Sequence, residues 1–193
     1  MKNKPFIHKT SEVSSSSKIG EGTFVWNHSQ IRENSKIGTN CVISKDVYVD
    51  EGVTIGNNVK IQNGVSVYKG VTIEDDVFLG PHSVLTNDLV PRAFNKEWAI
   101  TETILRKGCS IGANATIVAG NIIGVYAMVA AGSVVTESVP PFTLVRGNPA
   151  RIVSFICESG HKLEQTNKKD ESALYFCEKC KIELSFNFNI NHV

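Results

Sequence analysis

The fold of this chain is decided by residues 53–79, VTIGNNVKIQNGVSVYKGVTIEDDVFL, in which an aliphatic residue returns at every sixth position. The spacing extends in both directions from this stretch. Before its break it includes Ile7, Val13, Ile19, Val25, Ile31, Ile37, Ile43, Val49, Ile55, Ile61, Val67, Ile73, Leu79 and Leu85. After the break it includes Leu105, Ile111, Ile117, Ile123, Val129 and Val135. A period of six, which is typical of a parallel β-helix, fits neither an α-helix nor an alternating strand.

We call these aliphatic residues the rungs. Each rung is expected to point into a three-sided coil, because six residues form one flat side and every eighteenth residue then stacks on itself. Small or slim residues such as Thr23, Cys41 and Val59 stand four positions after a rung, where the backbone has to bend. Gly or Asn beside the corner tolerates the left-handed conformation of a tight turn. The unbroken ladder argues against a β-sandwich with coincidental spacing.

The composition excludes several classes of protein. The 193-residue chain has a formal net charge of +1, which gives no sign of nucleic-acid or membrane-surface binding. No apolar segment follows Met1–Lys4, and the apolar stretch 122–135 is too short to span a membrane. Five cysteines, an odd number, do not predict a disulfide framework, so we expect a cytoplasmic protein.

The ladder also predicts the organisation of the chain. We expect an N-terminal tail at 1–5, the β-helix at 6–140, a segment packing back on the coil at 141–156, and a polar tail at 157–193. Pro140 and Pro141 should end the ladder, because proline cannot donate to a further strand. The segment after them is expected to be an irregular strand or a short helix.

A long insertion interrupts the ladder. The interval from Leu85 to Leu105 is not a multiple of six, so a segment at about 88–103 must leave the coil. A smooth solenoid has no pocket of its own, and long loops often carry function. The rings of Phe94 and Trp98 favour packing against a surface over a tolerated insertion. We therefore expect an extruded functional arm.

Five motifs carry a family resemblance. They are KIQNGVSVY at 60–68, GPH at 80–82, TNDLVPRA at 86–93, IGANATIV at 111–118 and GNPAR at 147–151. With the ladder, they make residues 6–156 resemble the left-handed β-helix acyltransferases of the hexapeptide-repeat superfamily. Within it, the chain is most similar to N-acetyltransferases of nucleotide-linked 3-amino sugars, such as UDP-2-acetamido-3-amino-2,3-dideoxy-glucuronate. The Thr-Asn-Asp-x-x-Pro-Arg run is the most specific of these signals.

The resemblance implies acetyl transfer from acetyl-CoA to the 3-amino group of a nucleotide-linked sugar, in the synthesis of surface-polysaccharide precursors. It also implies a homotrimer with active sites in the grooves between neighbouring β-helices. The implied cofactor contacts are Gly112, Ala113, Ala131, Gly132, Arg146 and Arg151. Small corner residues leave room for pantetheine and an arginine suits a phosphate, although corner sterics alone also explain the glycines and alanines.

The chemistry requires an amine to attack a thioester. An amine with a pKa of about 8 is partly neutral at pH 7, so positioning matters more than a strong base. The resemblance assigns orientation of the amine to Asn87. His82 is a candidate proton acceptor; alternatively it faces the solvent and the departing CoA sulfur takes the proton.

The residues expected to contact the substrate are Asn63, Tyr68, Lys69, Asp88 and Arg92. Similar proteins often carry an acidic residue at the position of Lys69. Lys69 would repel an amine and favour a sugar carboxylate, unless it faces the solvent. Asp88 could instead cap a turn. UDP and dTDP, and sugars with and without a carboxylate, stay open as alternatives.

The tail carries a candidate metal site. Cys177 and Cys180 form a C-x-x-C pair, which is half of a zinc knuckle. Similar tails have Cys-x-Cys-Gly as the other half, whereas this chain has Cys157 and His161. We expect a zinc-ribbon-like tail with a structural Cys₃His zinc site; the alternative is a degenerate ribbon held by packing alone.

Three other classes compete with the N-acetyltransferase. An O-acetyltransferase on the same fold would need His82 or His28 as a base, because a hydroxyl is a much weaker acid than an ammonium group. A β-helical carbonic anhydrase needs three clustered histidines, but His8, His28 and His82 are not clustered. A non-enzymatic scaffold is the third class, and specific binding of acetyl-CoA would count against it.

Overall fold

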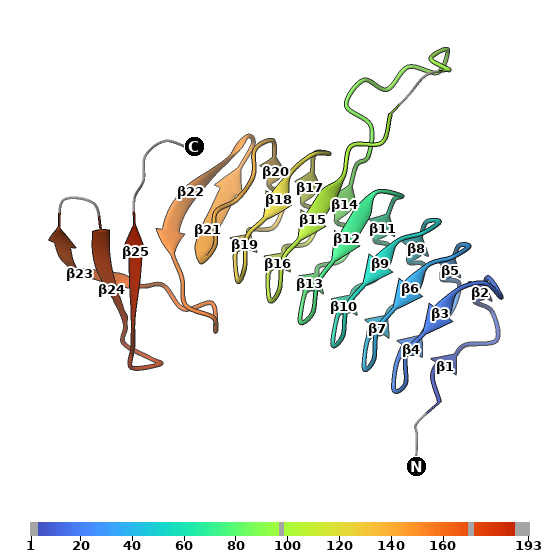
Figure 1. Cartoon of the computed structure of the whole chain (residues 1–193), viewed down its shortest axis with the longest axis horizontal. Helices are drawn as coiled ribbons and strands as arrows, with labels where there is room; N and C mark the ends of the chain where they lie inside the picture. The colour runs from blue at the N-terminus through green and yellow to red at the C-terminus, as the bar shows by residue number, and fades with distance from the viewer. Residues whose placement is uncertain (1–3, 97–98, 170–171, 188–193) are drawn as a thin grey trace.

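The computed structural model describes residues 4–96, 99–169 and 172–187. Expectations for residues 1–3, for Glu97 and Trp98 of the arm, and for 170–171 and 188–193 of the tail fall outside this part of the chain. Strands of two or three residues follow one another around three flat faces to form a parallel β-helix (Figure 1). The predicted all-β class and the left-handed β-helix of hexapeptide repeats are confirmed.

The three faces are sheets A, B and C, which successive strands occupy in turn. Sheet A contains β1 (Phe6–Ile7), β4 (Phe24–Val25), β7 (Val42–Ile43), β10 (Lys60–Ile61), β13 (Phe78–Leu79), β16 (Ser110–Ile111), β19 (Met128–Val129), β21 (Thr143–Gly147) and β22 (Ala150–Phe155). Sheet B contains β2 (Glu12–Val13), β5 (Gln30–Ile31), β8 (Tyr48–Val49), β11 (Ser66–Val67), β14 (Val84–Leu85), β17 (Thr116–Ile117) and β20 (Val134–Val135). Sheet C contains β3 (Lys18–Ile19), β6 (Lys36–Ile37), β9 (Thr54–Ile55), β12 (Val71–Ile73), β15 (Thr103–Leu105) and β18 (Ile122–Ile123). We name the corners the A–B, B–C and C–A edges.

Rungs stack on rungs along each sheet. Ile43, Ile61 and Leu79, for example, are successive Cα partners in sheet A. From Val25 onward the rungs are almost fully buried and form one continuous interior. Ile7, in the first coil, is still 43% exposed because it has a neighbouring coil on one side only. Full burial of such a side chain stabilises the fold by roughly 1.5–3 kcal/mol, so the interior is a sum of many similar contributions.

The corners repeat one backbone conformation three residues after a rung. Along the A–B edge, His82, Asn114 and Gly132 have φ of 57°, 57° and 69°. The glycines directly after rungs serve another purpose. Gly38 lies so close to the next coil that a Cβ atom would overlap the backbone of Gly56. The left-handed positions thus accept His and Asn, whereas the position after the rung selects Gly for close approach.

The arm leaves the β-helix between β14 and β15 and projects away from it (Figure 1). A hydrogen bond of 3.2 Å from the Thr101 N–H to the Asn87 carbonyl oxygen joins its two ends. Beyond this bond the coil resumes in register, with Ile73 opposite Leu105. Phe94, which was expected to pack against a surface, is 82% exposed in the single chain.

The segment after Pro140 and Pro141 differs from the prediction. It was expected to be an irregular strand or a short helix, but it is a β-hairpin: β21 pairs in parallel with β19, and β22 runs antiparallel to β21. The prolines occupy a corner, where no strand N–H is needed, and the Thr143 hydroxyl donates to the Pro140 carbonyl oxygen at 2.7 Å. Sheet A therefore continues beyond the prolines.

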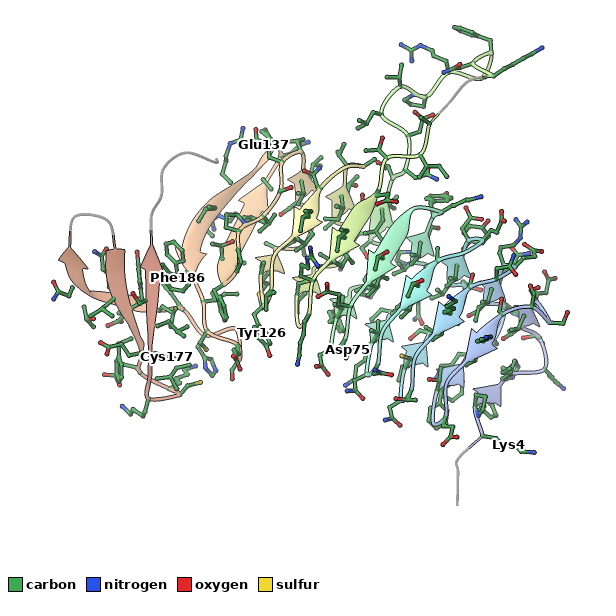
Figure 2. All side chains as sticks on the ribbon, viewed as in Figure 1. Lys4, Asp75, Tyr126, Glu137, Cys177 and Phe186 are labelled. Carbon is green, nitrogen blue, oxygen red and sulfur yellow. The ribbon has the colours of Figure 1, made fainter. Side chains whose placement is uncertain are left out.

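The C-terminal part forms a separate antiparallel sheet of β23 (Glu164–Lys169), β24 (Ser172–Cys177) and β25 (Ile182–Asn187). Figure 2 labels Cys177 and Phe186 on this sheet and Tyr126 on the neighbouring edge of the β-helix. Phe155, Tyr175 and Phe186 pack together, with ring centroids 4.7–5.5 Å apart. A helix that could cross a bilayer does not occur in the part of the chain that the structure describes.

Candidate active site

The predicted catalytic residues lie on two edges of the β-helix. Asn87 follows β14 at the B–C edge, and His82 precedes β14 at the A–B edge. Five extended residues span roughly 16 Å, so the two side chains begin at opposite ends of one flat side. A single chain therefore does not join Asn87 and His82 in one site.

Asn87 belongs to a stack of polar residues along the B–C edge. Its Nδ2 donates to the Lys69 carbonyl oxygen at 3.2 Å, one coil earlier. The Lys69 Nζ in turn lies 3.2 Å from Oε2 of Glu51, one coil earlier again. Both partners of this ion pair are close to half exposed, so the pair adds little stability but fixes the position of both charges.

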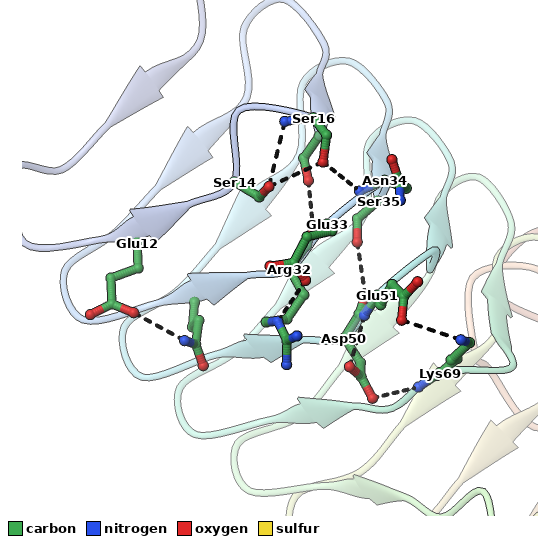
Figure 3. A network of polar contacts seen from close by, with 12 residues as sticks. Glu12, Ser14, Ser16, Arg32, Glu33, Asn34, Ser35, Asp50, Glu51 and Lys69 are labelled. Carbon is green, nitrogen blue, oxygen red and sulfur yellow. Dashed lines mark hydrogen bonds and ion pairs between the residues drawn. The ribbon is translucent and has the colours of Figure 1, made fainter.

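Asp50 is the centre of a network beside this stack (Figure 3). Its carboxylate accepts hydrogen bonds from the Tyr48 hydroxyl at 2.9 Å and from the backbone N–H groups of Glu51 and Lys69 at 2.8 and 3.1 Å. Partial burial acts to raise the pKa of Asp50, but these donors outweigh burial and hold the pKa below its usual value. Asp50 is therefore ionised at neutral pH and anchors the Lys69 backbone.

Aromatic rings cover the outer face of sheet B beside the same edge. Tyr68 follows β11 and is 38% exposed. Its ring is tilted against that of Tyr48, with centroids 5.9 Å apart. An exposed ring next to fixed polar groups suits a ligand that has both a flat ring and polar substituents.

The base of the arm contributes a shallow pocket of about 250 Å³ lined by Asn87, Asp88, Arg92 and Asn95. The Asp88 carboxylate accepts the Val90 N–H at 2.8 Å, so the turn-capping alternative for Asp88 is realised. The Arg92 guanidinium donates to the Pro91 carbonyl oxygen at 2.9 Å and is exposed. Asn87, Asp88 and Arg92 are thus together, as the motif suggested.

His82 lies apart from that pocket, together with Asn63. The His82 N–H donates to the Asn63 carbonyl oxygen at 3.0 Å along the A–B edge. The imidazole covers Gly64 so closely that a Cβ atom there would overlap its Nδ1. His82 is exposed. Asn63 was expected to contact the substrate together with Tyr68, but within one chain it lies on the A–B edge, which carries His82.

The predicted cofactor residues share the A–B edge. The Gly132 N–H donates to the Ala113 carbonyl oxygen at 2.8 Å, and a Cβ atom at Gly112 would overlap the Ala131 backbone. The β21–β22 hairpin continues this edge, because the Gly147 N–H donates to the Ser133 hydroxyl at 3.2 Å. Within the hairpin, Arg146 and Arg151 are Cα partners and both are exposed.

The predicted metal ligands also come together. One ligand atom from each of Cys157, His161, Cys177 and Cys180 lies within 4.8 Å of the others. Cys157 and His161 lie between β22 and β23, Cys177 ends β24, and Cys180 lies in the turn before β25, so no residue of the arm is among them. This arrangement is compatible with a structural site rather than a catalytic one.

Sequence reasoning missed Asp50 and Glu51. Both stand one coil before predicted residues, since Asp50 precedes Tyr68 and Glu51 precedes Lys69 by eighteen positions. The eighteen-residue period of the coil could therefore have indicated both residues. The network consists of predicted site residues and the residues eighteen positions before them.

Two protein-family models match this chain and identify its family. The family described as bacterial transferase hexapeptide (six repeats) matches residues 16–51, 28–62 and 52–87. The family described as hexapeptide repeat of succinyl-transferase matches residues 104–137. The matched segments cover both stretches of the ladder and together more than half of the chain. The chain therefore belongs to the hexapeptide-repeat transferases, which confirms the resemblance to this superfamily.

Curated relatives match shorter segments. A dTDP-3-amino-3,6-dideoxy-α-D-galactopyranose 3-N-acetyltransferase of Aneurinibacillus thermoaerophilus is 61% identical over 62 residues, which is 32% of this chain and 32% of the relative. A serine acetyltransferase of Buchnera aphidicola is 42% identical over 66 residues, 34% of this chain and 25% of the relative. The matches thus span a third or less of these relatives.

Solved structures match more of the fold. A Caulobacter crescentus protein crystallised with CoA and GDP-perosamine has 25% identity and a TM-score of 0.51, covering 80% of this chain and 59% of that one. A variant of GDP-perosamine N-acetyltransferase from the same organism has 23% identity and a TM-score of 0.55, covering 80% and 58%. The second likeness concerns the fold alone.

Proposed function

We propose that this protein transfers the acetyl group of acetyl-CoA to the 3-amino group of a nucleotide-linked amino sugar, a precursor of a surface polysaccharide. The observation that carries the proposal is the 61% identity, over 62 residues, to a transferase named for that reaction. The polar stack at the B–C edge supplies the chemistry. We place the reaction in the cytoplasm, because acetyl-CoA is available there and the cysteines of this chain are free.

Asn87 orients the nucleophile in this proposal. Its Nδ2 donates to the Lys69 carbonyl oxygen and Asn87 lines the pocket at the base of the arm, so we assign Oδ1 as the acceptor for the substrate. An acceptor there binds one N–H of the neutral amine and leaves the nitrogen lone pair for the thioester carbonyl carbon. The C–N bond forms, the C–S bond breaks, and the proton lost by nitrogen ends on the CoA sulfur. No strong base is required.

The charges at the B–C edge favour an uncharged sugar. Lys69 was expected either to attract a sugar carboxylate or to face the solvent, and its ammonium group is paired with Glu51 at 3.2 Å. Glu51 thereby supplies, one coil away, the carboxylate that Lys69 replaces in the motif. The dTDP-linked dideoxy sugar in the name of the Aneurinibacillus relative also lacks a carboxylate. We therefore propose a dTDP-linked neutral 3-amino sugar as the substrate.

The site is completed by a second copy of the chain. The B–C edge carries most of the substrate candidates, whereas the A–B edge carries the cofactor candidates and Asn63, at opposite borders of sheet B. In a homotrimer with a threefold axis along the β-helix, the A–B edge of one subunit faces the B–C edge of the next. Acetyl-CoA then lies along Gly112, Ala113, Ala131 and Gly132, with Arg146 or Arg151 at its phosphates.

Release of the CoA thiol from acetyl-CoA tests the function. The assay offers dTDP- and UDP-linked 3-amino sugars, each with and without a carboxylate. We expect turnover with the neutral dTDP sugar and roughly a hundredfold lower kcat/KM in Asn87→Ala. Asn40→Gly is the matched control, because it removes an amide from the C–A edge at a left-handed position that glycine accepts.

Three results would contradict the proposal or a part of it. Absence of turnover across the whole panel, with acetyl-CoA still binding, would direct attention to a hydroxyl acceptor. Loss of activity in His82→Ala with retention in Asn87→Ala would assign the chemistry to the imidazole. Sedimentation of the intact chain as a monomer under assay conditions would exclude the shared site.

A further inference from the structure

We propose that Cys157, His161, Cys177 and Cys180 bind one zinc ion that fastens the C-terminal sheet to the end of the β-helix. The ion has no part in acetyl transfer, so this site stands or falls independently of the proposed function. Within the described residues, no other group of three or more His, Cys, Asp and Glu side chains gathers its ligand atoms in this way.

The spacing of the ligand atoms matches zinc. Zinc holds thiolates at about 2.3 Å and imidazole nitrogens at about 2.0–2.1 Å in a tetrahedron, which places two thiolates about 3.8 Å apart and a thiolate about 3.6 Å from a nitrogen. The Cys157 Sγ lies 3.8 Å from the Cys180 Sγ and 3.7 Å from the Cys177 Sγ. The His161 Nδ1 lies 3.3 Å from the Cys180 Sγ and 4.0 Å from the Cys177 Sγ.

Two tight turns deliver these ligands. In the first turn the Cys157 N–H donates to the His161 carbonyl oxygen at 2.9 Å, and Gly160 has a φ of 77°. In the second, the Lys181 N–H donates to the Cys177 carbonyl oxygen at 2.8 Å, and Lys181 has a φ of 56°. In the second turn the Cys180 N–H also donates to the Cys177 Sγ, with the nitrogen 3.4 Å from the sulfur. An N–H donor to sulfur stabilises a metal-bound thiolate.

The alternatives to zinc fit less well. The sulfur separations are far above the bond length of a disulfide, about 2.05 Å, and all five cysteines are free thiols. Calcium and magnesium prefer oxygen ligands, whereas three thiolates and an imidazole select a softer ion. A closed set of four protein ligands is the arrangement of structural zinc sites.

The C-terminal sheet has too small an apolar interior to be stable alone, so a bound metal would stabilise it. Its buried hydrophobic cluster consists of Leu163 and two of the ligands, Cys157 and Cys177, with aromatic rings partly buried around them. Units below about 40 residues usually require a metal, disulfides or association. The first turn contacts the β-helix, since a Cβ atom at Gly160 would approach Cε of Met128 in β19 to 3.0 Å. A metal that fixes this turn therefore fixes the sheet against sheet A.

Metal analysis of the full-length protein tests the proposal. We expect about one zinc per chain, and we expect Co²⁺ added to the chelated, reduced protein to give the thiolate charge-transfer and tetrahedral d–d bands. The Cys177→Ser/Cys180→Ser double variant should lose both zinc and the cobalt spectrum. Lys179→Ser, an exposed position between the two ligands, is the matched control and should keep them.

A gain-of-ligand variant separates ligation from folding. His161→Cys should retain zinc and increase the cobalt charge-transfer intensity, because a fourth thiolate replaces the imidazole, whereas His161→Ala should weaken zinc binding. An intact wild-type chain that contains no metal and gives no cobalt bands would overturn the site. A bound metal that survives in the double variant would overturn the assignment of its ligands.

Discussion

The β-helix and the C-terminal sheet achieve order in opposite ways. The β-helix has one continuous interior that runs from Val25 to Val145 and is built from similar apolar contributions. The C-terminal sheet has a buried hydrophobic cluster of only Cys157, Leu163 and Cys177, and two of these three side chains are predicted metal ligands. A distributed interior tolerates the loss of one member, whereas a concentrated one does not. The following experiments test this difference.

Metal removal is expected to have the largest effect, and only on the C-terminal sheet. Structural zinc contributes on the order of 10–16 kcal/mol in small domains, far more than a three-residue interior supplies. Hydrogen exchange of the chelated protein should show β24 amides exchanging as in an unfolded chain, while the amides of β8 to β17 stay protected. Unchanged protection of β24 after complete metal removal would contradict the comparison.

A cavity in the β-helix is expected to cost less. Leu79 is fully buried in sheet A, and Leu79→Ala should lower the free energy of unfolding by about 2–5 kcal/mol without changing the fold. Urea unfolding followed by circular dichroism measures this. The same substitution at Leu163 should open the C-terminal sheet and leave the main unfolding transition in place. If Leu163→Ala destabilised the β-helix equally, the two regions would share one interior.

The two kinds of corner glycine should differ in cost. Gly38→Ala forces a Cβ atom into the backbone of the next coil and should cost about 3 kcal/mol. Gly52 has a φ of 70° with open space around it, so Gly52→Ala should cost about 1 kcal/mol from backbone strain alone. Paired thermal unfolding of the two variants makes the measurement. Equal losses would show that close approach does not select glycine after the rung.

The smallest effect is expected at Asp50 and depends on pH. Tyr48→Phe removes a donor to the Asp50 carboxylate and should cost about 1 kcal/mol at pH 7. The folded-state pKa of Asp50 is lowered, so its contribution is present above its unfolded pKa of about 3.9 and is lost as the pH falls through the lower folded value. The difference between wild type and Tyr48→Phe should therefore shrink below about pH 4.

Tyr68→Phe is the control for this pH series. The Tyr68 ring packs beside that of Tyr48, but it is the Tyr48 hydroxyl that donates to the Asp50 carboxylate. Tyr68→Phe therefore removes a neighbouring hydroxyl and leaves this hydrogen bond in place. Its stability should follow that of the wild type at every pH. A pH dependence shared by both variants would assign the effect to the aromatic pair rather than to Asp50.

The sequence predicted the β-helix well because the rungs carry the period themselves. From Val25 onward they are buried as expected, and the break after Leu85 correctly indicated the arm. The hairpin after Pro140 was not predicted. Consecutive prolines predict the end of a ladder, but these prolines stand at a corner, where the missing N–H has no consequence.

The candidate site was predicted only in part, because closeness in sequence and closeness in space differ in a coil. Asn87 and His82 are five positions apart but are separated by β14. Asn87 and Lys69 are eighteen positions apart and hydrogen-bonded. The tail ligands were grouped correctly, since the C-x-x-C pair is a local motif. The metal and the shared site between subunits stay predictions.

The bond that closes the base of the arm has a consequence for how such a protein can diversify. Because the Thr101 N–H meets the Asn87 carbonyl oxygen, the chain departs and returns at one point, and β15 continues the spiral as though nothing had been inserted. The residues between Asn87 and Thr101 form a cassette, whose length and sequence can change without changing the geometry of the coils. A lineage can exchange this cassette while every coil beneath keeps its geometry, and under the proposed function such an exchange would change the acceptor.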